Sequence, residues 1–164
     1  MNSKYLLLLA LGIGALTSCS DDNEKTTSLS GNTYSNPLTS YSAADPTVWK
    51  EGNQFYMFAT NTSVIRKSTD LINWTDGGKM FEKKPTFVTD AGAAVWAPDI
   101  EKVGDKYILY FAMSAMGKPA TAGIVISTAP SPEGPFSLEE SVDGKGKLFT
   151  SSEIDVRNSI DPCY

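Results

Sequence analysis

Three aspartates stand next to prolines at intervals along the chain. Asp45 and Asp161 each come just before a proline, in Ala-Asp-Pro and Ile-Asp-Pro, whereas Asp99 comes just after one, in Trp-Ala-Pro-Asp. Paired carboxylates that face one pocket can break a glycosidic bond, because one accepts a proton from water while another protonates the leaving oxygen. An Asp-Pro pair is also a common turn former. Its recurrence in register at Asp45 and Asp161 favours a shared site over two unrelated turns.

The prolines belong to an internal repeat. Pro46 and Gly52 recur after 52 residues as Pro98 and Gly104. Each glycine opens a Gly-Asn or Gly-Asp pair, which supplies the positive-φ residues of a tight hairpin turn. The run after each turn is apolar on both faces, as expected of a strand sandwiched between neighbouring sheets. These runs are residues 55–60 and 107–112, and the predicted outer hairpins are residues 64–68 with 69–74 and residues 123–128 with 130–136.

A repeat of this kind predicts an all-β fold. Four-stranded units of roughly fifty residues in tandem are typical of a β-propeller, whose blades pack face to face around a central channel. Pro162 begins a third unit 64 residues after Pro98, with residues 137–157 as an extra loop. The chain therefore reads as about two blades and the start of a third, a piece of a longer protein. A β-sandwich built from the same short strands is the alternative.

The start of the chain has the pattern of an export signal. Lys4 precedes an apolar run, residues 5–16, that is too short to span a bilayer. The run ends in Leu-Thr-Ser-Cys, which resembles a bacterial lipobox and predicts a lipid on Cys19; an ordinary signal peptide is the alternative. The predicted organisation is a signal at residues 1–18, a polar linker at 19–36 and the propeller part at 37–164. The expected location is the cell envelope, in the periplasm or at the surface, with the lipid as the only membrane contact.

Composition excludes several kinds of site. The chain has 19 acidic and 14 basic residues, and this net charge of −5 argues against a nucleic-acid partner. It has no histidine, so an imidazole triad, a histidine zinc site and a histidine general base are all excluded within these residues. With Cys19 lipidated, Cys163 has no partner for a disulfide, and we expect it to be a buried, small apolar residue. We assign no metal or cofactor and expect a monomer.

Several of these motifs together resemble glycoside hydrolase family 43. Members of that family are five-bladed propellers that hydrolyse α-L-arabinofuranosyl and β-D-xylosyl linkages with inversion. The resemblance extends over nearly everything from residue 36 to the end of the chain. It is carried by Ala44-Asp45-Pro46-Thr47-Val48, Tyr56-Met57-Phe58-Ala59-Thr60, Ser68-Thr69-Asp70-Leu71-Ile72-Asn73-Trp74, Val95-Trp96-Ala97-Pro98-Asp99-Ile100, Gly134-Pro135-Phe136 and Asn158-Ser159-Ile160-Asp161-Pro162.

The resemblance implies a role for each equivalent aspartate. Asp45 would be the general base that activates the attacking water. Asp161 would orient the general acid and raise its pKa, since a negative neighbour keeps an acid protonated. The acid itself would be a Glu from a later blade, which is absent from this chain, and neither Glu101 nor Glu153 takes its place in the alignment. The chain alone is therefore expected to be inactive.

The resemblance also implies substrate-binding residues. Trp96 would stack on a sugar or pack between blades, and Asp99 would bond to substrate or brace the neighbouring strand. Met116 stands where arabinan-cleaving relatives often have the Phe of Ser-x-Phe-Gly. Asn158 would hold the Asp161 loop or simply form a turn. Some relatives bind a divalent ion on the propeller axis through a histidine, which this chain lacks, so the resemblance assigns no metal here.

The function expected from these residues is inverting hydrolysis of plant cell-wall arabinan or arabinoxylan by a lipid-anchored enzyme. A β-xyloside is the second choice of substrate. Two other classes of function fit the same pattern. One is a carbohydrate-binding propeller lipoprotein without catalysis, and the other is a propeller used for protein contacts. Trp49 and Trp74 are predicted to pack in the first unit rather than to bind a ligand.

Overall fold

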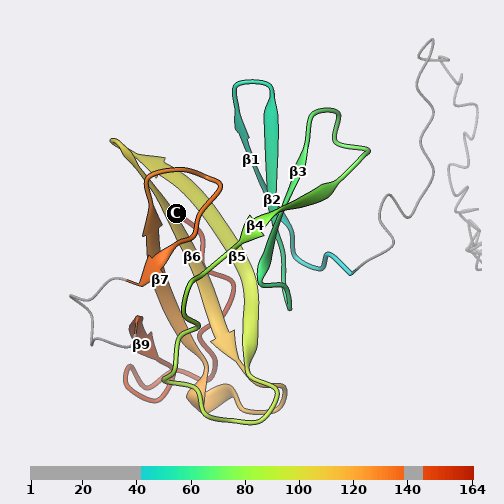
Figure 1. The fold of residues 1–164 in the computed structure, drawn as a ribbon. Coiled ribbons are helices and arrows are strands. Elements are labelled where there is room, and N and C mark those ends of the chain that lie inside the picture. The colour runs from blue at the N-terminus through green and yellow to red at the C-terminus, as the bar shows by residue number, and fades with distance from the viewer. Residues whose placement is uncertain (1–41, 139–145) are drawn as a thin grey trace, which may run out of the picture. The chain divides into compact units, whose positions relative to one another are not determined.

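The computed structural model describes residues 42–138 and 146–164 (Figure 1). The predicted export signal, Cys19 and the polar linker therefore lie outside the described residues. Within them the fold is all-β apart from one short 3-10 turn, η1 (Pro119–Thr121). The first sheet contains β1 (Thr47–Glu51), β2 (Gln54–Phe58), β3 (Val64–Ser68) and β4 (Thr75–Lys79). The second contains β5 (Ala94–Val103), β6 (Lys106–Ser114), β7 (Gly123–Ala129), β8 (Ser137–Leu138) and β9 (Lys147–Thr150).

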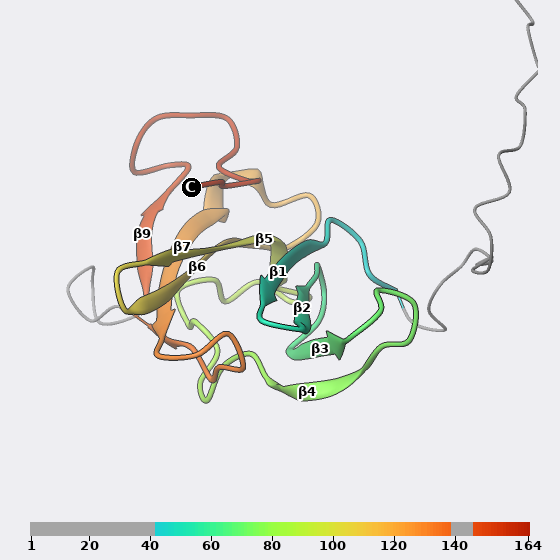
Figure 2. The same ribbon diagram turned by 90° about the horizontal axis from the view of Figure 1, so that it is seen from above.

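The two sheets repeat the same meander of antiparallel strands. The first has the order β1-β2-β3-β4 and the second β5-β6-β7-β8. The inner hairpin of each turns at a glycine in the left-handed region, Gly52 at φ 58° and Gly104 at φ 64°. Both hairpins lie where the repeat predicts them. The inner strands β1 and β5 lie side by side (Figures 1 and 2).

The outer strands differ from the sequence prediction. Residues 69–74 form a turn, and β4 begins only after Trp74; residues 130–136 lead into the two-residue strand β8. The stretch 137–157, predicted as a loop, contains β8 and β9. β8 pairs only with Ser127 and Thr128, so it leaves the edge of the other half of β7 open. β9 pairs with Gly123 to Val125 on that edge and satisfies their backbone groups.

The core lies between the two sheets and is built from alternate residues of their facing strands. Phe58 and Phe111 are fully buried. Phe58 meets Phe136 edge to face, with ring centroids 5.7 Å apart, and Phe111 meets Phe81 at 5.0 Å. Aromatic pairs in such geometry add to the free energy gained from burying their area. Phe58 and Phe111, which come from the apolar runs after the two hairpin turns, therefore help to join one sheet to the next.

Trp49 packs at the rim of this interface, as predicted, with its ring 5.8 Å from that of Tyr107 in an edge-to-face contact. Glu51 accepts hydrogen bonds from Lys102 Nζ at 3.0 Å and from the Trp49 indole at 3.2 Å. Lys102, then Trp49, lower the pKa of Glu51 below its usual value. Trp74 donates its indole N–H to the Leu71 carbonyl, which closes the turn before β4. Both tryptophans thus have packing or turn roles.

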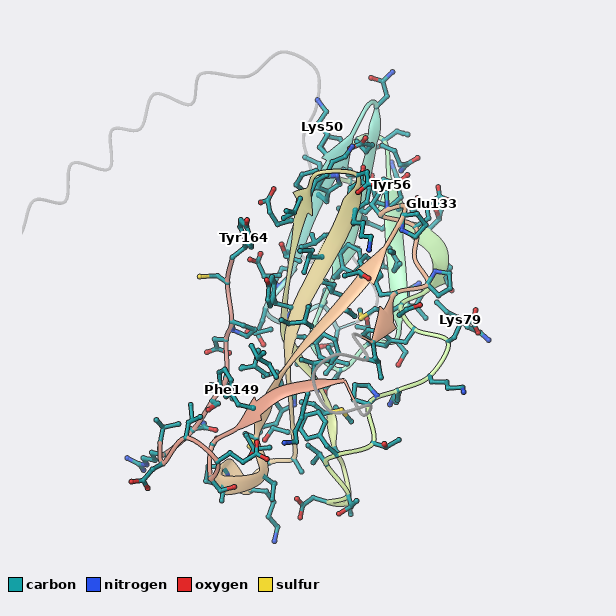
Figure 3. The ribbon with its side chains drawn as sticks, turned by 90° about the vertical axis from the view of Figure 1, so that its left-hand side faces the viewer. Lys50, Tyr56, Lys79, Glu133, Phe149 and Tyr164 are labelled. Carbon is teal, nitrogen blue, oxygen red and sulfur yellow. The ribbon has the colours of Figure 1, made fainter. Side chains whose placement is uncertain are left out.

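A second polar contact joins the sheets on their outer side. The Tyr56 hydroxyl donates to Glu133 Oε1 at 3.2 Å, and Lys67 Nζ lies 3.3 Å from the same oxygen. Figure 3 shows Tyr56 and Glu133 next to each other. Burial and the negative charge of Glu133 raise the pKa of the Tyr56 hydroxyl. The contact fixes the loop before β8 against β2.

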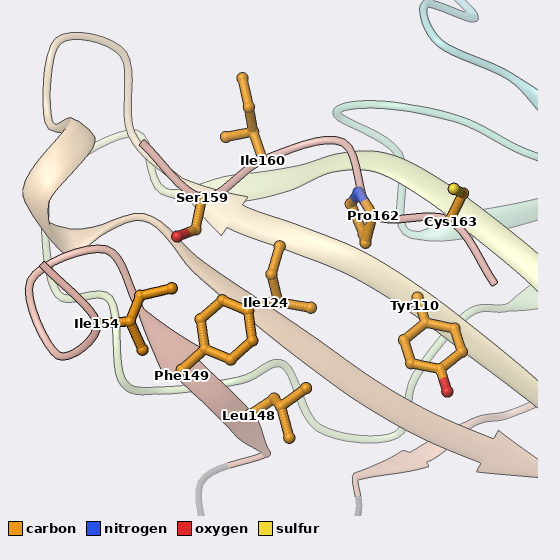
Figure 4. Close-up of a pocket in the computed structure, with 9 residues that line it drawn as sticks. All are labelled: Tyr110, Ile124, Leu148, Phe149, Ile154, Ser159, Ile160, Pro162 and Cys163. Atoms are coloured by element: carbon orange, nitrogen blue, oxygen red, sulfur yellow. The ribbon is translucent and has the colours of Figure 1, made fainter. Parts of the chain in front are cut away.

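The opposite face of the second sheet is also apolar. Tyr107, Leu109 and Phe111 point into the core, so the alternating residues of β6 face away from the first sheet. On that side a cavity of about 400 Å³ is lined from β6, β7, β9 and the segment 159–163 (Figure 4). Cys163 lines it but is exposed, so the prediction that Cys163 is buried was wrong. The segment that carries Cys163 lies on this face, where the ring centroids of Tyr164 and Tyr110 are 6.2 Å apart, and the Cys163 side chain is on the exposed side of that segment.

Candidate active site

The three repeats begin with the same strained turn. Asp45, Ala97 and Asp161 each precede a proline, and they have φ values of 47°, 40° and 54°. A positive φ is uncommon for a residue other than glycine, and strained backbone of this kind clusters at functional sites. Ala97 is therefore the equivalent of the two aspartates in the second unit. Asp99 occupies a different position, two residues further along β5.

Asp45 is tied to the second unit through Thr60. The exposed Asp45 carboxylate accepts a hydrogen bond from Thr60 Oγ1 at 2.7 Å. The same hydroxyl oxygen accepts the backbone N–H of Ala97 at 2.8 Å, and the Thr60 N–H donates to the Ala44 carbonyl at 2.9 Å. Thr60 is buried at the end of the β2 run. It fixes the carboxylate at the point where the first inner hairpin meets β5.

Asp99 lies between the first unit and the beginning of the third. Its Oδ1 accepts a hydrogen bond from Thr47 Oγ1 at 3.3 Å, and its Oδ2 accepts one from the Tyr164 backbone N–H at 3.0 Å. The side chain is half-buried at the end of an irregularity in the β5–β6 register. Asp99 was expected either to bond to substrate or to brace the neighbouring strand. Its bond to Thr47 of β1 corresponds to the second role.

Asp161 is exposed on a segment that Ser151 anchors. The buried Ser151 hydroxyl donates to the Ala122 carbonyl at 3.0 Å and accepts the N–H of Ser159 at 2.8 Å. Asn158 was expected either to hold this loop through its side chain or to form a simple turn. Among the described residues it makes no such bond, and Ser151 holds the segment instead.

Three of the predicted substrate-binding residues come together in one cavity. Trp96, Met116 and Asn158 line a hollow of about 260 Å³. Met116 is 87% exposed and Trp96 half-buried, so both side chains present surface to it. Its remaining lining includes two cations, Lys118 and Arg157. The cavity is large enough for a sugar ring, and neither catalytic aspartate candidate is among the residues that line it.

The two glutamates set aside in the sequence have local partners. Glu101 Oε1 accepts the N–H of Lys102 at 3.0 Å. Glu153 pairs with Lys147 and accepts the N–H of Thr150 at 2.8 Å. The ion pair with Lys147, followed by the bond from Thr150, lowers the pKa of Glu153. A general acid needs a raised pKa, so Glu153 is poorly suited to that role.

The described residues do not assemble a metal site. The sequence has no histidine. Within residues 42–138 and 146–164, no three potential ligands from His, Cys, Asp and Glu gather in one place. The same ranges also hold no helix that is long and apolar enough to cross a membrane.

The comparison with protein families agrees with this geometry. The profile for glycosyl hydrolases family 43 matches residues 34–164, which include both sheets and all three strained turns. The chain belongs to this family. The match extends over most of the chain and includes every candidate catalytic and substrate-binding residue.

Its family 43 relatives include arabinan-degrading enzymes. The chain is 31% identical to the extracellular exo-α-(1→5)-L-arabinofuranosidase ArbA of Cellvibrio japonicus, over 72% of this chain and 35% of that protein. It is 32% identical to the extracellular endo-α-(1→5)-L-arabinanase 1 of Bacillus subtilis, over 72% of this chain and 38% of that protein. The chain thus spans between a third and two fifths of these relatives.

The fold comparison gives the same result. The arabinanase Arb43A of Bacillus subtilis superposes with a TM-score of 0.61 at 29% identity, covering 76% of this chain and 44% of that one. The arabinanases are five-bladed β-propellers. The propeller prediction is therefore confirmed over the alternative β-sandwich, and the two sheets described here are part of such a fold.

Two functional candidates, Thr60 and Ser151, were missed in the sequence. Thr60 follows a buried strand and Ser151 follows β9, so both are short hydroxyl residues at strand ends. Such residues commonly cap or hold neighbouring turns. Nothing in the sequence states which distant aspartate a hydroxyl will meet, because that depends on how one sheet packs on the next.

Proposed function

We propose that this chain is part of an inverting glycoside hydrolase that cleaves α-1,5-arabinan. The observation that carries the proposal is the strained Asp-Pro turn that Asp45 and Asp161 share. Asp99 of the second unit bonds to Thr47 and to Tyr164, which lie next to these two turns. Family membership and the activities for which the two relatives are named support arabinan over a β-xyloside. One relative is named as an exo-acting enzyme and the other as endo-acting.

In the proposed mechanism, Asp45 accepts a proton from a water molecule. The water oxygen attacks the anomeric carbon from the face opposite the leaving group, so one C–O bond forms while the glycosidic C–O bond breaks. Thr60, through its bond to Oδ2, holds the carboxylate in place for this transfer. A general acid from a later blade donates a proton to the leaving oxygen. The charge of Asp161 keeps that acid protonated until then.

The chain is proposed to be the N-terminal part of the catalytic domain. Its coverage of the relatives supports this, as does the apolar outer face of the second sheet, where another blade would pack. The lipid on Cys19 and the envelope location are also proposals, and the relatives named extracellular agree with export. Labelling with a radioactive fatty acid would test the lipid: Cys19→Ala should abolish label that the unaltered protein carries.

The hydrolase proposal is tested on the protein from the complete reading frame. It should release arabinose or arabino-oligosaccharides from linear α-1,5-arabinan, with the product first formed as the inverted anomer by proton NMR. An aryl β-xyloside tests the other substrate class. If neither substrate is cleaved but arabino-oligosaccharides still bind, the result favours a carbohydrate-binding propeller and defeats the hydrolase proposal.

A further inference from the structure

One carboxylate joins the first, second and third repeats. Asp99 extends from β5 and accepts hydrogen bonds from Thr47 on β1 and from the backbone of Tyr164. Thr47 lies two residues after Asp45, and Tyr164 lies three residues after Asp161. The two donors therefore come from the segments that carry the two aspartates of the proposed site. Asp99 is flanked on both sides by those segments.

The short segments between these residues are stiff. Pro46 separates Asp45 from Thr47, and Pro162 follows Asp161 directly. Each proline ring fixes its own φ and restricts the residue before it. Because few backbone torsions separate donor and aspartate, a displacement of Thr47 or Tyr164 is passed to the neighbouring carboxylate. Holding both donors on one acceptor then fixes the spacing of Asp45 and Asp161.

The bonds are suited to this task. An ionised acceptor makes a stronger hydrogen bond than a neutral one, and the half-buried Asp99 side chain uses one oxygen for each segment. With both oxygens engaged by protein donors, the carboxylate is committed to the scaffold. Asp45 differs, because its carboxylate accepts the Thr60 hydroxyl through Oδ2 and the residue is otherwise exposed to solvent.

We propose that Asp99 is a positioning residue that sets the separation between Asp45 and Asp161. The inference rests on the proposed hydrolase function, because spacing matters through the reaction. In an inverting enzyme the general base and the general acid must leave room for the attacking water. Asp161 is proposed to orient that acid, so its distance from Asp45 bears on this spacing. A misplacement of about 1 Å can cost about 10²-fold in rate.

The test compares two substitutions in the complete enzyme. Asp99→Ala removes both acceptors and should lower kcat on linear arabinan by about 10²-fold with little change in KM. Asp99→Asn should retain most of the activity. Its carbonyl can accept the Tyr164 N–H, and its amide can donate to the Thr47 hydroxyl, which is able to accept. Asp105→Asn, at an exposed turn of the same sheet, is the matched control and should behave as the unaltered enzyme.

Other outcomes overturn the inference. A raised KM with unchanged kcat in Asp99→Ala would indicate a substrate contact, and an Asp99→Asn enzyme as poor as Asp99→Ala would indicate that the charge itself is needed. Thr47→Val should lower kcat in the unaltered enzyme but add little to Asp99→Ala, because the shared bond is already lost. Full additivity of the two substitutions would contradict a role through Thr47.

A second readout does not depend on turnover. The Tyr164 amide should exchange with deuterium slowly in the unaltered protein and in Asp99→Asn, and faster in Asp99→Ala. Equal exchange rates in all three would show that the bond does not hold the segment. If the unaltered enzyme cleaves no arabinan, the proposed function fails, whereas normal cleavage by Asp99→Ala defeats only the positioning role.

Discussion

The Thr60 hydroxyl donates a hydrogen bond to the Asp45 carboxylate across 2.7 Å. The same oxygen accepts the N–H of Ala97, at the strained turn of the second repeat. Thr60 therefore connects the proposed general base to the neighbouring unit. The orientation of Asp45 depends on the packing of two sheets, since a rigid scaffold is what holds a catalytic group in its productive geometry.

Replacing Thr60 tests that connection. Thr60→Val keeps the shape but removes both bonds, and hydrogen bonds to charged groups contribute about 1.5–3 kcal/mol. We expect kcat of the complete enzyme on arabinan to fall by about tenfold to a hundredfold. Thr60→Ser retains the hydroxyl and is the matched control. A Thr60→Val enzyme with normal kcat would show that this bond does not position Asp45.

The aromatic contacts between the sheets set the stability of the fold. Phe111 is fully buried and packs on Phe81. Phe111→Ala should reduce the free energy of unfolding by about 3–5 kcal/mol, because it removes buried area and leaves a cavity. Urea denaturation of the complete protein measures this. Val48→Ala, at a site 44% exposed, should change the midpoint little; a similarly small shift for Phe111→Ala would contradict the proposed core.

The hydrogen bonds of Asp70 predict that the free energy of unfolding depends on pH. It accepts bonds from the Asn73 backbone and side chain, the Ile72 N–H and the Ser68 hydroxyl, and these hold its pKa well below the usual range. A depressed folded-state pKa stabilises the protein above the unfolded pKa of about 3.9, and this stability is lost as pH falls through the folded value.

Asp70→Ala should therefore lower the melting temperature by a few degrees at neutral pH. The difference from the unaltered protein should shrink once the pH falls below about 4, where the Asp70 carboxylate begins to be protonated in the unfolded chain but not yet in the folded one. Asp105→Ala, at a turn without these bonds, should show no such trend. A difference that stays constant from neutral to acidic pH would mean that the carboxylate charge does not stabilise this turn.

Much of the fold could be predicted because the residues that repeat, such as the turn glycines, are required by particular backbone conformations. Gly52 and Gly104 occupy left-handed turns, and the apolar runs after them form β2 and β6, the second strands of the inner hairpins. The outer strands were less predictable. The pairing of β9 with β7 depends on how much of β7 the short β8 leaves uncovered, and that is a tertiary property.

The site was predictable in part for the same reason. A proline after Asp45 and Asp161 identified equivalent turns, and their shared positive φ agrees with that alignment. The partners of these residues were not predictable. Thr60 and Tyr164 reach their acceptors across 15 and 65 residues of sequence. Cys163 was misplaced because an apolar composition suggests burial whether or not a covering segment is present.

The most direct measurement compares the complete enzyme with its Asp45→Asn variant on linear arabinan, alongside calorimetric binding of arabino-oligosaccharides to both. Loss of the general base should reduce kcat by about 10²–10⁴-fold, while sugar affinity stays nearly unchanged. Cleavage of arabinan by Asp45→Asn at the unaltered rate would contradict the account, because the carboxylate at residue 45 would then take no part in the reaction.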